Sequence, residues 1–407
     1  IKSILNICSS HGSISLFQYN GIKCSLYVNP KIMNREGYIT YNVEKKDLSS
    51  NGGSYMGALY EIGVKGKTED GDKETNIFMK HIVKSEVPLT FDITDVYKRE
   101  HFVYTDLIKE LYDFQEKENI PLDERYKIAK AFDECNDKTI ILENLTAKGF
   151  KTYYRMDVVS LEYAELAVKD LARLHGLSLA LEIKRPDYYE RKIKDMNCLY
   201  FLDKRWDGFA RNMCLFASQF LEQDVRKKVL QPLINIAGKY GSYMNDNSCI
   251  KTICHGDYRH NNIMVKETNG KPTEVIAVDY QITHRGNPVL DFLYFIFWGT
   301  DQEFRKNHLE YLKKLYHQYL GTFLSYFNIE VEDVLPLKEF ERQYQEKLDF
   351  GLMISVFYLP FLFPPEDDVP DLTDNKTPLD KFAIKVDKKY SERFSGIVDD
   401  FIQWGYL

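Results

Sequence analysis

The stretch that decides the fold is His255-Gly256-Asp257-Tyr258-Arg259-His260-Asn261-Asn262. An apolar run that ends in an acid, Val275-Ile276-Ala277-Val278-Asp279, follows it along the chain. Together the two segments offer a carboxylate, an amide five residues later, and a second carboxylate at the end of an expected strand. Carboxylate and amide oxygens suit Mg²⁺, so this set can hold the ion and orient a hydroxyl against a nucleotide phosphate.

Each of these residues also has a purely structural interpretation. Asp257 could be a turn residue, Asn262 a cap, and Asp279 a cap at the end of the strand. The short motif H-x-D-x-x-x-x-N is already uncommon by chance, and an acid that ends an apolar strand seventeen residues after the asparagine is rarer still. The combination therefore favours the chemical interpretation.

Length and composition restrict the class of protein. The chain has 407 residues, 44% hydrophobic and 28% charged, as expected of an ordinary folded chain with two domains or two large lobes. Its net charge of −7 argues against nucleic acid as a partner, because phosphate backbones need a basic face. No obligate protein partner is evident.

The cysteines and the apolar runs bear on the compartment. Seven scattered cysteines without a C-x-x-C pair predict a reduced, cytoplasmic chain rather than a disulfide framework or a zinc site. The longest near-apolar run, residues 351–363, is too short for a bilayer and contains Pro360, so we expect no membrane insertion. The sequence starts at Ile1, and whether a targeting segment precedes it stays an open question. Residues 1–37 receive no chemical assignment.

The N-terminal part is expected to be mostly strands with one long helix. Strands are expected at 39–43, 55–64 and 76–83, and the turn-rich residues 47–54 between the first two could cover phosphates or form a plain surface hairpin. Lys80 lies among apolar neighbours in the third strand. In the helix predicted over 95–112, Glu100 falls on the apolar stripe. We expect Glu100 to pair with Lys80, unless it lies at the edge of the stripe and reaches water.

The boundary between the two parts is expected after Leu145. A buried strand over 139–142 runs into Glu143-Asn144-Leu145, and residues 146–154 read as a linker, which divides the chain into 1–145 and 146–407. The second part is predicted to be mainly helical, and His175 is expected to be a buried hydrogen-bonding residue. Helices are expected over 157–181, 211–240, 302–327, 337–359 and 377–403.

These motifs resemble the aminoglycoside and choline kinase type of phosphotransferase, and more closely the insect ecdysteroid kinase-like family. The resemblance covers about residues 47–363 and includes three further marks, Glu143-Asn144-Leu145 with Gly149-Phe150, Leu171 to His175, and Asn287-Pro288 to Leu293. It implies an α+β, two-lobed protein-kinase-like fold. An N-lobe with an antiparallel sheet and one long helix would be followed by a larger, mostly helical C-lobe, with ATP and Mg²⁺ bound between them.

The resemblance also implies a role for individual residues. Asp257 is the expected catalytic base, and Asn262 and Asp279 are the expected magnesium ligands. His255 and Asp291 would brace the catalytic loop. The nucleotide would be bound by Lys80 with its partner Glu100, by a phosphate loop, and by a hinge between the lobes whose backbone bonds the adenine. The residues assigned to the phosphate loop and the hinge are Asn51, Gly52, Gly53, Ser54, Glu143 and Leu145.

Two residues depart from the family pattern. Arg259 stands where the family often has tryptophan, and Tyr280 replaces a common phenylalanine. Neither change touches the metal chemistry, but Arg259 could alter contacts with the substrate or the phosphate.

The acceptor is expected to be a small molecule. Only twelve residues separate Asp279 from Asp291, and the long A-P-E-terminated segment of protein kinases is missing. The family resemblance points to an ecdysteroid, with the 22-hydroxyl as the most concrete acceptor. An aromatic-rich segment could line an apolar pocket or belong to the core; it comprises Phe350, Phe357, Tyr358, Phe361 and Phe363.

Other functions stay open. The acidic segment 366–374 is expected to be either a solvated loop or the border of a substrate cleft. In the second case its carboxylates would suit a cationic acceptor such as choline, ethanolamine or an aminoglycoside. A kinase that detoxifies foreign hydroxyl compounds is a further alternative. A different class is a catalytically inactive, kinase-fold ligand-binding protein, against which the intact set of motif residues argues.

Overall fold

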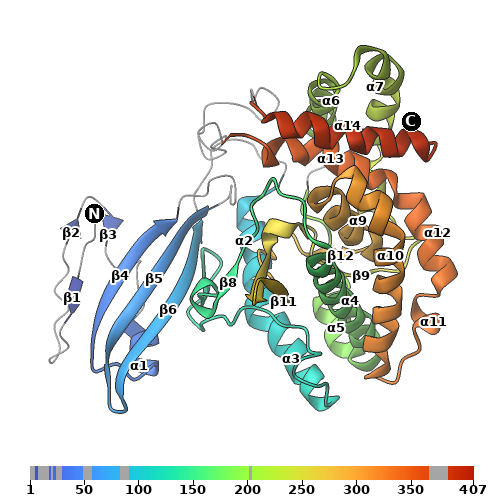
Figure 1. Ribbon diagram of the computed structural model, residues 1–407. Helices are drawn as coiled ribbons and strands as arrows, with labels where there is room; N and C mark the ends of the chain where they lie inside the picture. The colour runs from blue at the N-terminus through green and yellow to red at the C-terminus, as the bar shows by residue number, and fades with distance from the viewer. Residues whose placement is uncertain are drawn as a thin grey trace.

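The protein has the expected α+β architecture, with an antiparallel sheet at the N-terminal side and helices filling the remainder (Figure 1). The computed structural model describes residues 30–48, 57–82, 91–200, 204–365 and 384–407. It also describes the backbone of three short strand segments, β1 (Leu5–Ile7), β2 (Gln18–Tyr19) and β3 (Ile22–Lys23). The expected phosphate loop, Asn51–Ser54, and the acidic segment 366–374 lie outside the described residues.

The N-terminal sheet has the strand order β1-β4-β5-β6-β7, and every neighbouring pair is antiparallel. Its long strands are β4 (Thr40–Leu48), β5 (Gly57–Thr68), β6 (Gly71–Ile82) and β7 (Thr139–Glu143), with helix α1 (Pro30–Arg35) before them. Apolar residues of alternating strand positions, such as Ile77 and Met79, are buried. Lys80 is paired in register with Leu59 on one side and Ile140 on the other, which places its backbone between two neighbouring strands.

One continuous helical segment follows the sheet strands, as predicted. It consists of α2 (Ile93–Phe102), a π-helical turn η2 (Val103–Leu107) and α3 (Ile108–Lys117). The Asp92 side chain caps the start by accepting from the Thr94 N–H. Glu100 is buried on the same stripe as Val96 and Val103, because the helical period brings all three to one face.

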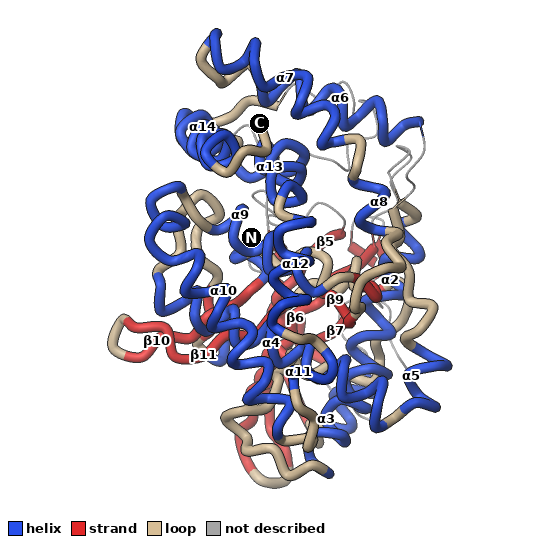
Figure 2. Tube along the Cα trace, turned by 90° about the vertical axis from the view of Figure 1, so that its right-hand side faces the viewer, coloured by secondary structure: helices blue, strands red, loops and turns tan. Residues whose placement is uncertain are grey.

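The C-terminal part is mainly helical, and three buried helices carry its core. They are α4 (Leu161–Lys184), α9 (Pro288–Gly299) and α13 (Asp349–Leu362). Every residue of α9 is buried, which is typical of a helix surrounded on all sides. Figure 2 shows α10 (Gln302–Ser325) beside α4. The shorter helices of this part include α5 (Pro186–Lys192), α11 (Val331–Val334) and α12 (Leu337–Lys347).

Short strands place the motif of residues 255–262 against these helices. The antiparallel ladder β8-β10-β11 comprises β8 (Phe150–Lys151), β10 (Ile263–Thr268) and β11 (Lys271–Ala277). A second pair is β9 (Thr252–Cys254) with β12 (His284–Gly286). The motif runs from the end of β9 through the turn η4 (His260–Asn262) into β10.

Some expected element boundaries were wrong. The helix expected over 211–240 is three elements, α6 (Lys204–Ser218), α7 (Gln223–Ala237) and α8 (Tyr240–Met244). The helix expected over 337–359 is divided into α12 and α13 at Leu348, where a mostly polar helix is followed by a buried, apolar one. The expected linker 146–154 contains a 3₁₀ turn, η3 (Thr146–Lys148), and β8.

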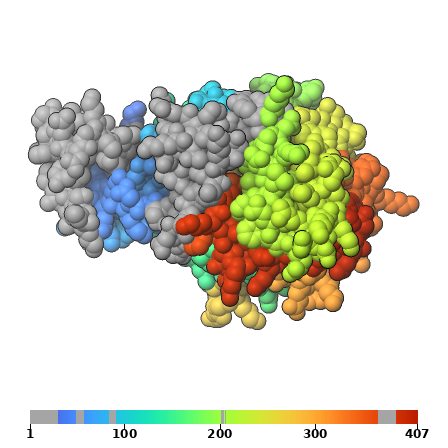
Figure 3. Space-filling view, turned by 90° about the horizontal axis from the view of Figure 1, so that it is seen from above, coloured from blue at the N-terminus to red at the C-terminus, as the bar shows by residue number. Residues whose placement is uncertain are grey.

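The helices α6, α7 and α14 (Lys388–Gln403) form one end of the molecule, where they lie at the surface (Figure 3).

The aromatic-rich segment is mostly core: Phe350, Phe357 and Phe363 are buried. Cys135, Cys198, Cys214, Cys249 and Cys254 are free thiols. Of the helices in the described ranges, none has both the length and the apolar character needed to cross a bilayer.

Candidate active site

The loop after β9 is held in place by a carboxylate from the first turn of α9. Asp291 accepts hydrogen bonds from the backbone N–H of His255 at 2.6 Å and of Gly256 at 2.9 Å. His175 of α4 lies 3.3 Å from the same carboxylate and 2.7 Å from the Tyr316 hydroxyl, so it is the buried hydrogen-bonding residue that was expected. Asp291 thus ties two helices to the catalytic loop.

The His255 ring links this loop to the strand that carries Asp279. Its Nε2 lies 3.1 Å from the Val278 carbonyl oxygen, and its Nδ1 accepts from the Asp257 N–H at 3.3 Å. A carbonyl oxygen only accepts, so Nε2 carries the proton of a neutral ring. Burial lowers the pKa of His255, which keeps the ring in this neutral form.

Asp257 presents its two carboxylate oxygens differently. Oδ2 accepts from Asn262 Nδ2 at 2.8 Å and from Arg259 Nε at 3.1 Å. Within the described part of the chain, no group donates to Oδ1. The side chain is therefore fixed through one oxygen, and the other can accept a hydrogen bond from an incoming hydroxyl.

Asn262 and Asp279 lie next to each other through the backbone. The Val278 N–H donates to the Asn262 carbonyl at 2.8 Å, which joins the two segments one residue before the acid. Asn262 uses its Nδ2 on Asp257, so its amide oxygen stays available. Asp279 has a φ of 71°, a left-handed conformation that is uncommon outside glycine and costs about 1–3 kcal/mol in most residues. Such strain is frequent where a side chain must point at a ligand.

Lys80 bridges the sheet and the helical part of the molecule. Its Nζ lies 2.8 Å from Glu100 Oε2, 2.7 Å from Asp279 Oδ1 and 2.9 Å from Gln281 Oε1. Burial alone would lower the pKa of Lys80, but the carboxylates of Asp279 and Glu100 raise it above its usual value. Burial and the nearby Asp279 carboxylate raise the pKa of Glu100 above its usual value, although the Lys80 ammonium opposes this shift.

These groups open onto a cavity of about 700 Å³ between the sheet and the helical part, called here the interlobe cavity. Lys80, Glu100, Asn262 and Asp279 line one end of it, and Glu143 to Leu145 line the edge formed by the end of β7. The Asn144 side chain accepts from the Thr146 N–H at 2.9 Å and so shapes this edge. The structure thus brings together every described residue that the sequence assigned to the nucleotide.

Sequence reasoning gave no role to some residues at the site. Gln281 contacts Lys80, yet a glutamine two residues after an acid carries no pattern of its own. Lys151, Tyr153 and Arg155 line the interlobe cavity, although their segment reads as a linker. A signal was present in the alternating Phe150 and Lys151, but a two-residue strand is too short for periodicity to reveal.

The donor set fits a hard divalent cation. Two oxygens that face one cavity, from an amide and from a carboxylate, are ligands that Mg²⁺ prefers and are few enough to leave room for water and phosphate. Asp279 keeps its second oxygen, since Lys80 holds only Oδ1. The described residues contain another cluster of possible ligands, His175, Cys254 and Asp291, but the imidazole and the carboxylate are already hydrogen-bonded there.

Aromatic side chains lie near Asp257 and its partner Arg259. The Arg259 guanidinium lies 5.3 Å from the centre of the Trp298 ring, which stacks on Tyr294 at 5.2 Å. Burial raises the pKa of Tyr294, and the nearby Asp257 carboxylate raises it further. A cavity of about 10 Å³ lies here, lined by Tyr200, Gly256 and Tyr294 among others.

Several solved kinase structures are similar to this chain at low identity. The ethanolamine kinase of Plasmodium vivax is 11% identical with a TM-score of 0.43, and the alignment covers 94% of this chain and 86% of that one. A microcompartment-associated aminopropanol kinase is 12% identical with a TM-score of 0.43, covering 93% and 99%. The choline kinase LicA from Streptococcus pneumoniae is 10% identical with a TM-score of 0.38, covering 84% and 89%. These TM-scores are too low to support a conclusion about this chain.

The family is established by the sequence itself. Comparison with curated protein sequences gave no match. Residues 51–329 match the ecdysteroid kinase-like family. This range is more than half of the chain, and it includes Lys80 as well as Asp257 and Asp279. The protein therefore belongs to the ecdysteroid kinase-like family.

Proposed function

We propose that the protein is an ATP-dependent kinase that transfers the γ-phosphate to a hydroxyl of a small molecule. Membership of the ecdysteroid kinase-like family supports a small-molecule kinase. The observation that carries the proposal is that Lys80, Asn262 and Asp279 line the interlobe cavity, while Asp257 is hydrogen-bonded to Asn262 and keeps one carboxylate oxygen free beside them. Phosphoryl transfer needs positioned charge and little covalent help, and this arrangement supplies it.

In the proposed reaction each residue has one task. Asp257 Oδ1 accepts the proton of the attacking hydroxyl, while Arg259 and Asn262 hold Oδ2 in place. Lys80 offers its ammonium to the phosphates of the nucleotide. Asn262 and Asp279 would hold Mg²⁺, which supplies charge neutralisation on the phosphates when it is bound. The Leu145 backbone N–H, which donates to no group in the described part, is available for the adenine.

The charges beside Asp257 support a neutral acceptor. A choline, ethanolamine or aminoglycoside cation next to the base would meet the Arg259 guanidinium at the position where the family often has tryptophan. An apolar body would instead meet Trp298 and Tyr294. Together with the family assignment, this supports an ecdysteroid as the acceptor, with its 22-hydroxyl as the most concrete candidate and an inactive steroid phosphate as the product.

The acceptor can be tested by comparing matched substrates. Purified protein with ATP and Mg²⁺ would be offered an ecdysteroid, its 22-deoxy analogue, choline and an aminoglycoside, with ADP release and product mass as readouts. We expect a phosphate on the ecdysteroid and none on the 22-deoxy analogue. Phosphorylation of the 22-deoxy analogue would reject the position, and phosphorylation of choline alone would reject the steroid. Nucleotide binding without turnover of any acceptor would favour an inactive ligand-binding protein.

A further inference from the structure

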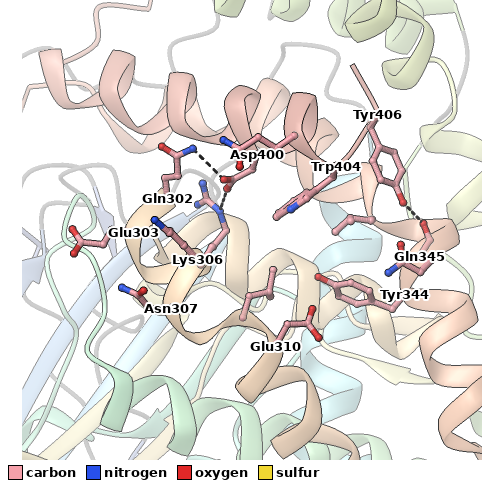
Figure 4. Close-up of a pocket in the computed structure, with 14 residues that line it drawn as sticks. Gln302, Glu303, Lys306, Asn307, Glu310, Tyr344, Gln345, Asp400, Trp404 and Tyr406 are labelled. Carbon is pink, nitrogen blue, oxygen red and sulfur yellow. Dashed lines mark hydrogen bonds and ion pairs between the residues drawn. The ribbon is translucent and has the colours of Figure 1, made fainter.

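A second large cavity lies in the helical part of the molecule (Figure 4). Its volume is about 870 Å³, and it is bordered by the first turns of α10, by α12 and by the end of α14 with the residues after it. It shares no lining residue with the interlobe cavity, so the proposed kinase reaction does not account for it.

Two buried polar groups in the wall of this cavity lack a hydrogen-bond partner within the described residues. Arg305 is 2% exposed; its Nε donates to Asp400 at 2.6 Å and its Nη1 to the Thr300 carbonyl at 2.9 Å, but Nη2 has no acceptor. Tyr344 is also 2% exposed, and its hydroxyl has no partner. A buried polar group without a partner is costly, and nearly all such groups in folded proteins are satisfied.

The unpartnered groups define what a ligand must offer. A guanidinium can only donate, and a tyrosine hydroxyl can donate to the same acceptor, so the missing partner is an oxygen with free lone pairs. Figure 4 shows the Tyr344 ring reaching from α12 towards α10, with its hydroxyl at the far end. Arg305 of α10 and Tyr344 of α12 both line the cavity, so a ligand bound in it lies between two helices that each carry an unpartnered donor.

The charges of the wall are balanced before a ligand binds. Asp400 is paired with Arg305, and Glu310 is paired with Lys313 at 2.9 Å. In the described part, Glu303 and Lys306 form no ion pair, and they lie one turn apart on α10 and offset each other. A carboxylate therefore meets no net repulsion, and it accepts stronger hydrogen bonds from a guanidinium than a neutral oxygen does.

The rest of the cavity wall is apolar or aromatic. Leu309 and Leu348 line it, and Trp404, which is 36% exposed, presents a large ring at the end of α14. We propose that this cavity binds a small amphipathic carboxylate, whose oxygens accept from Arg305 and Tyr344 and whose apolar body packs against Trp404. The site is independent of the interlobe cavity.

The proposal can be tested by calorimetric titration with phenylbutyrate, and with phenylbutanol and phenylbutylamine as neutral and cationic counterparts. We expect the carboxylate to bind more tightly than both counterparts. Tyr344→Phe removes only the unpartnered hydroxyl and should weaken phenylbutyrate binding roughly tenfold. Tyr390→Phe is the matched control, because it removes a buried, unpartnered hydroxyl that does not line the cavity.

Thermal unfolding of the unliganded proteins separates binding from folding. Both variants should unfold at the wild-type temperature or above it, since each loses a buried group that has no partner. The proposal is overturned if phenylbutyrate does not bind at millimolar concentrations, if phenylbutanol or phenylbutylamine binds equally well, or if Tyr344→Phe binds phenylbutyrate as tightly as Tyr390→Phe. In those cases water alone would satisfy the two donors.

Discussion

At the scale of single residues, Asp257 decides whether the site can react. Asp257→Asn keeps the size of the side chain and removes the proton acceptor. We expect kcat to fall by roughly a hundredfold to ten-thousandfold with nucleotide affinity nearly unchanged, because the residue does not line the interlobe cavity. Steady-state kinetics and nucleotide titration measure both quantities. Asp333→Asn, at an exposed position far along the chain, is the control. Near-normal turnover by Asp257→Asn would show that Asp257 is not the base.

A second residue-scale prediction concerns Asp170, which lies behind the catalytic loop. Its carboxylate is 3.2 Å from the Tyr258 hydroxyl, and burial raises its pKa to about 7. Between the usual pKa of an aspartate and pH 7, the Asp170 carboxyl group is ionised in the unfolded chain but keeps its proton in the folded protein. The free energy of unfolding should therefore fall as the pH rises through this window, by on the order of 1 kcal/mol per pH unit, and level off above it.

Asp170→Asn tests this directly. The amide does not ionise, so the contribution of this site to the pH dependence should disappear, and the variant should gain stability relative to the wild type as the pH approaches 7. Urea unfolding at several pH values measures the difference. An identical pH dependence for both proteins would show that Asp170 is already ionised in the folded state.

At the scale of elements, the turn between β9 and η4 needs a glycine. Gly256 has a φ of 84°, and a Cβ placed there would lie 2.6 Å from the Ile282 carbonyl oxygen. Gly270, in the hairpin between β10 and β11, has a similar φ of 75° but no atom within 4 Å of such a Cβ. Alanine at either position would suffer the strain of a positive φ, but only alanine at Gly256 would also clash with the Ile282 carbonyl oxygen. Comparing the two variants therefore separates the steric clash from the backbone strain.

We expect Gly256→Ala to lower the free energy of unfolding by more than Gly270→Ala, which should cost about 1 kcal/mol. Only Gly256→Ala should also reduce kcat, since it displaces the loop that holds Asp257. Denaturant unfolding and kinetics give both comparisons. Equal effects at the two positions would mean that the loop can shift to admit the methyl group.

Much of this element-level organisation could be predicted from the sequence. Long periodic segments, such as the helix with Glu100 on its stripe, follow from apolar spacing. The break at Leu348 could not be predicted, because Leu348 keeps helical backbone angles and neither proline nor glycine stands at the break. Gln281 and the segment around Tyr153 reach the site only through tertiary packing, which leaves no local signal.

At the scale of the whole molecule, the Lys80 cluster connects the sheet to the helical part. Lys80→Met would leave the carboxylates of Glu100 and Asp279 buried without a cation. We expect a loss of about 3–5 kcal/mol in the free energy of unfolding. The double variant Lys80→Met with Glu100→Gln should recover part of that loss, since one of the two uncompensated charges is gone. A double variant no more stable than Lys80→Met would show that Glu100 is uncharged or solvated without Lys80.

The central claim is that the interlobe site transfers phosphate from ATP to a small neutral alcohol. The measurement that tests it most directly is a single-turnover reaction with radiolabelled γ-phosphate, Mg²⁺ and an ecdysteroid, comparing wild type with Asp257→Asn. The proposed function predicts label on the steroid with the wild type, and label remaining on bound nucleotide with the variant. Label that stays on the nucleotide in both proteins, or reaches the steroid equally fast in both, would contradict it.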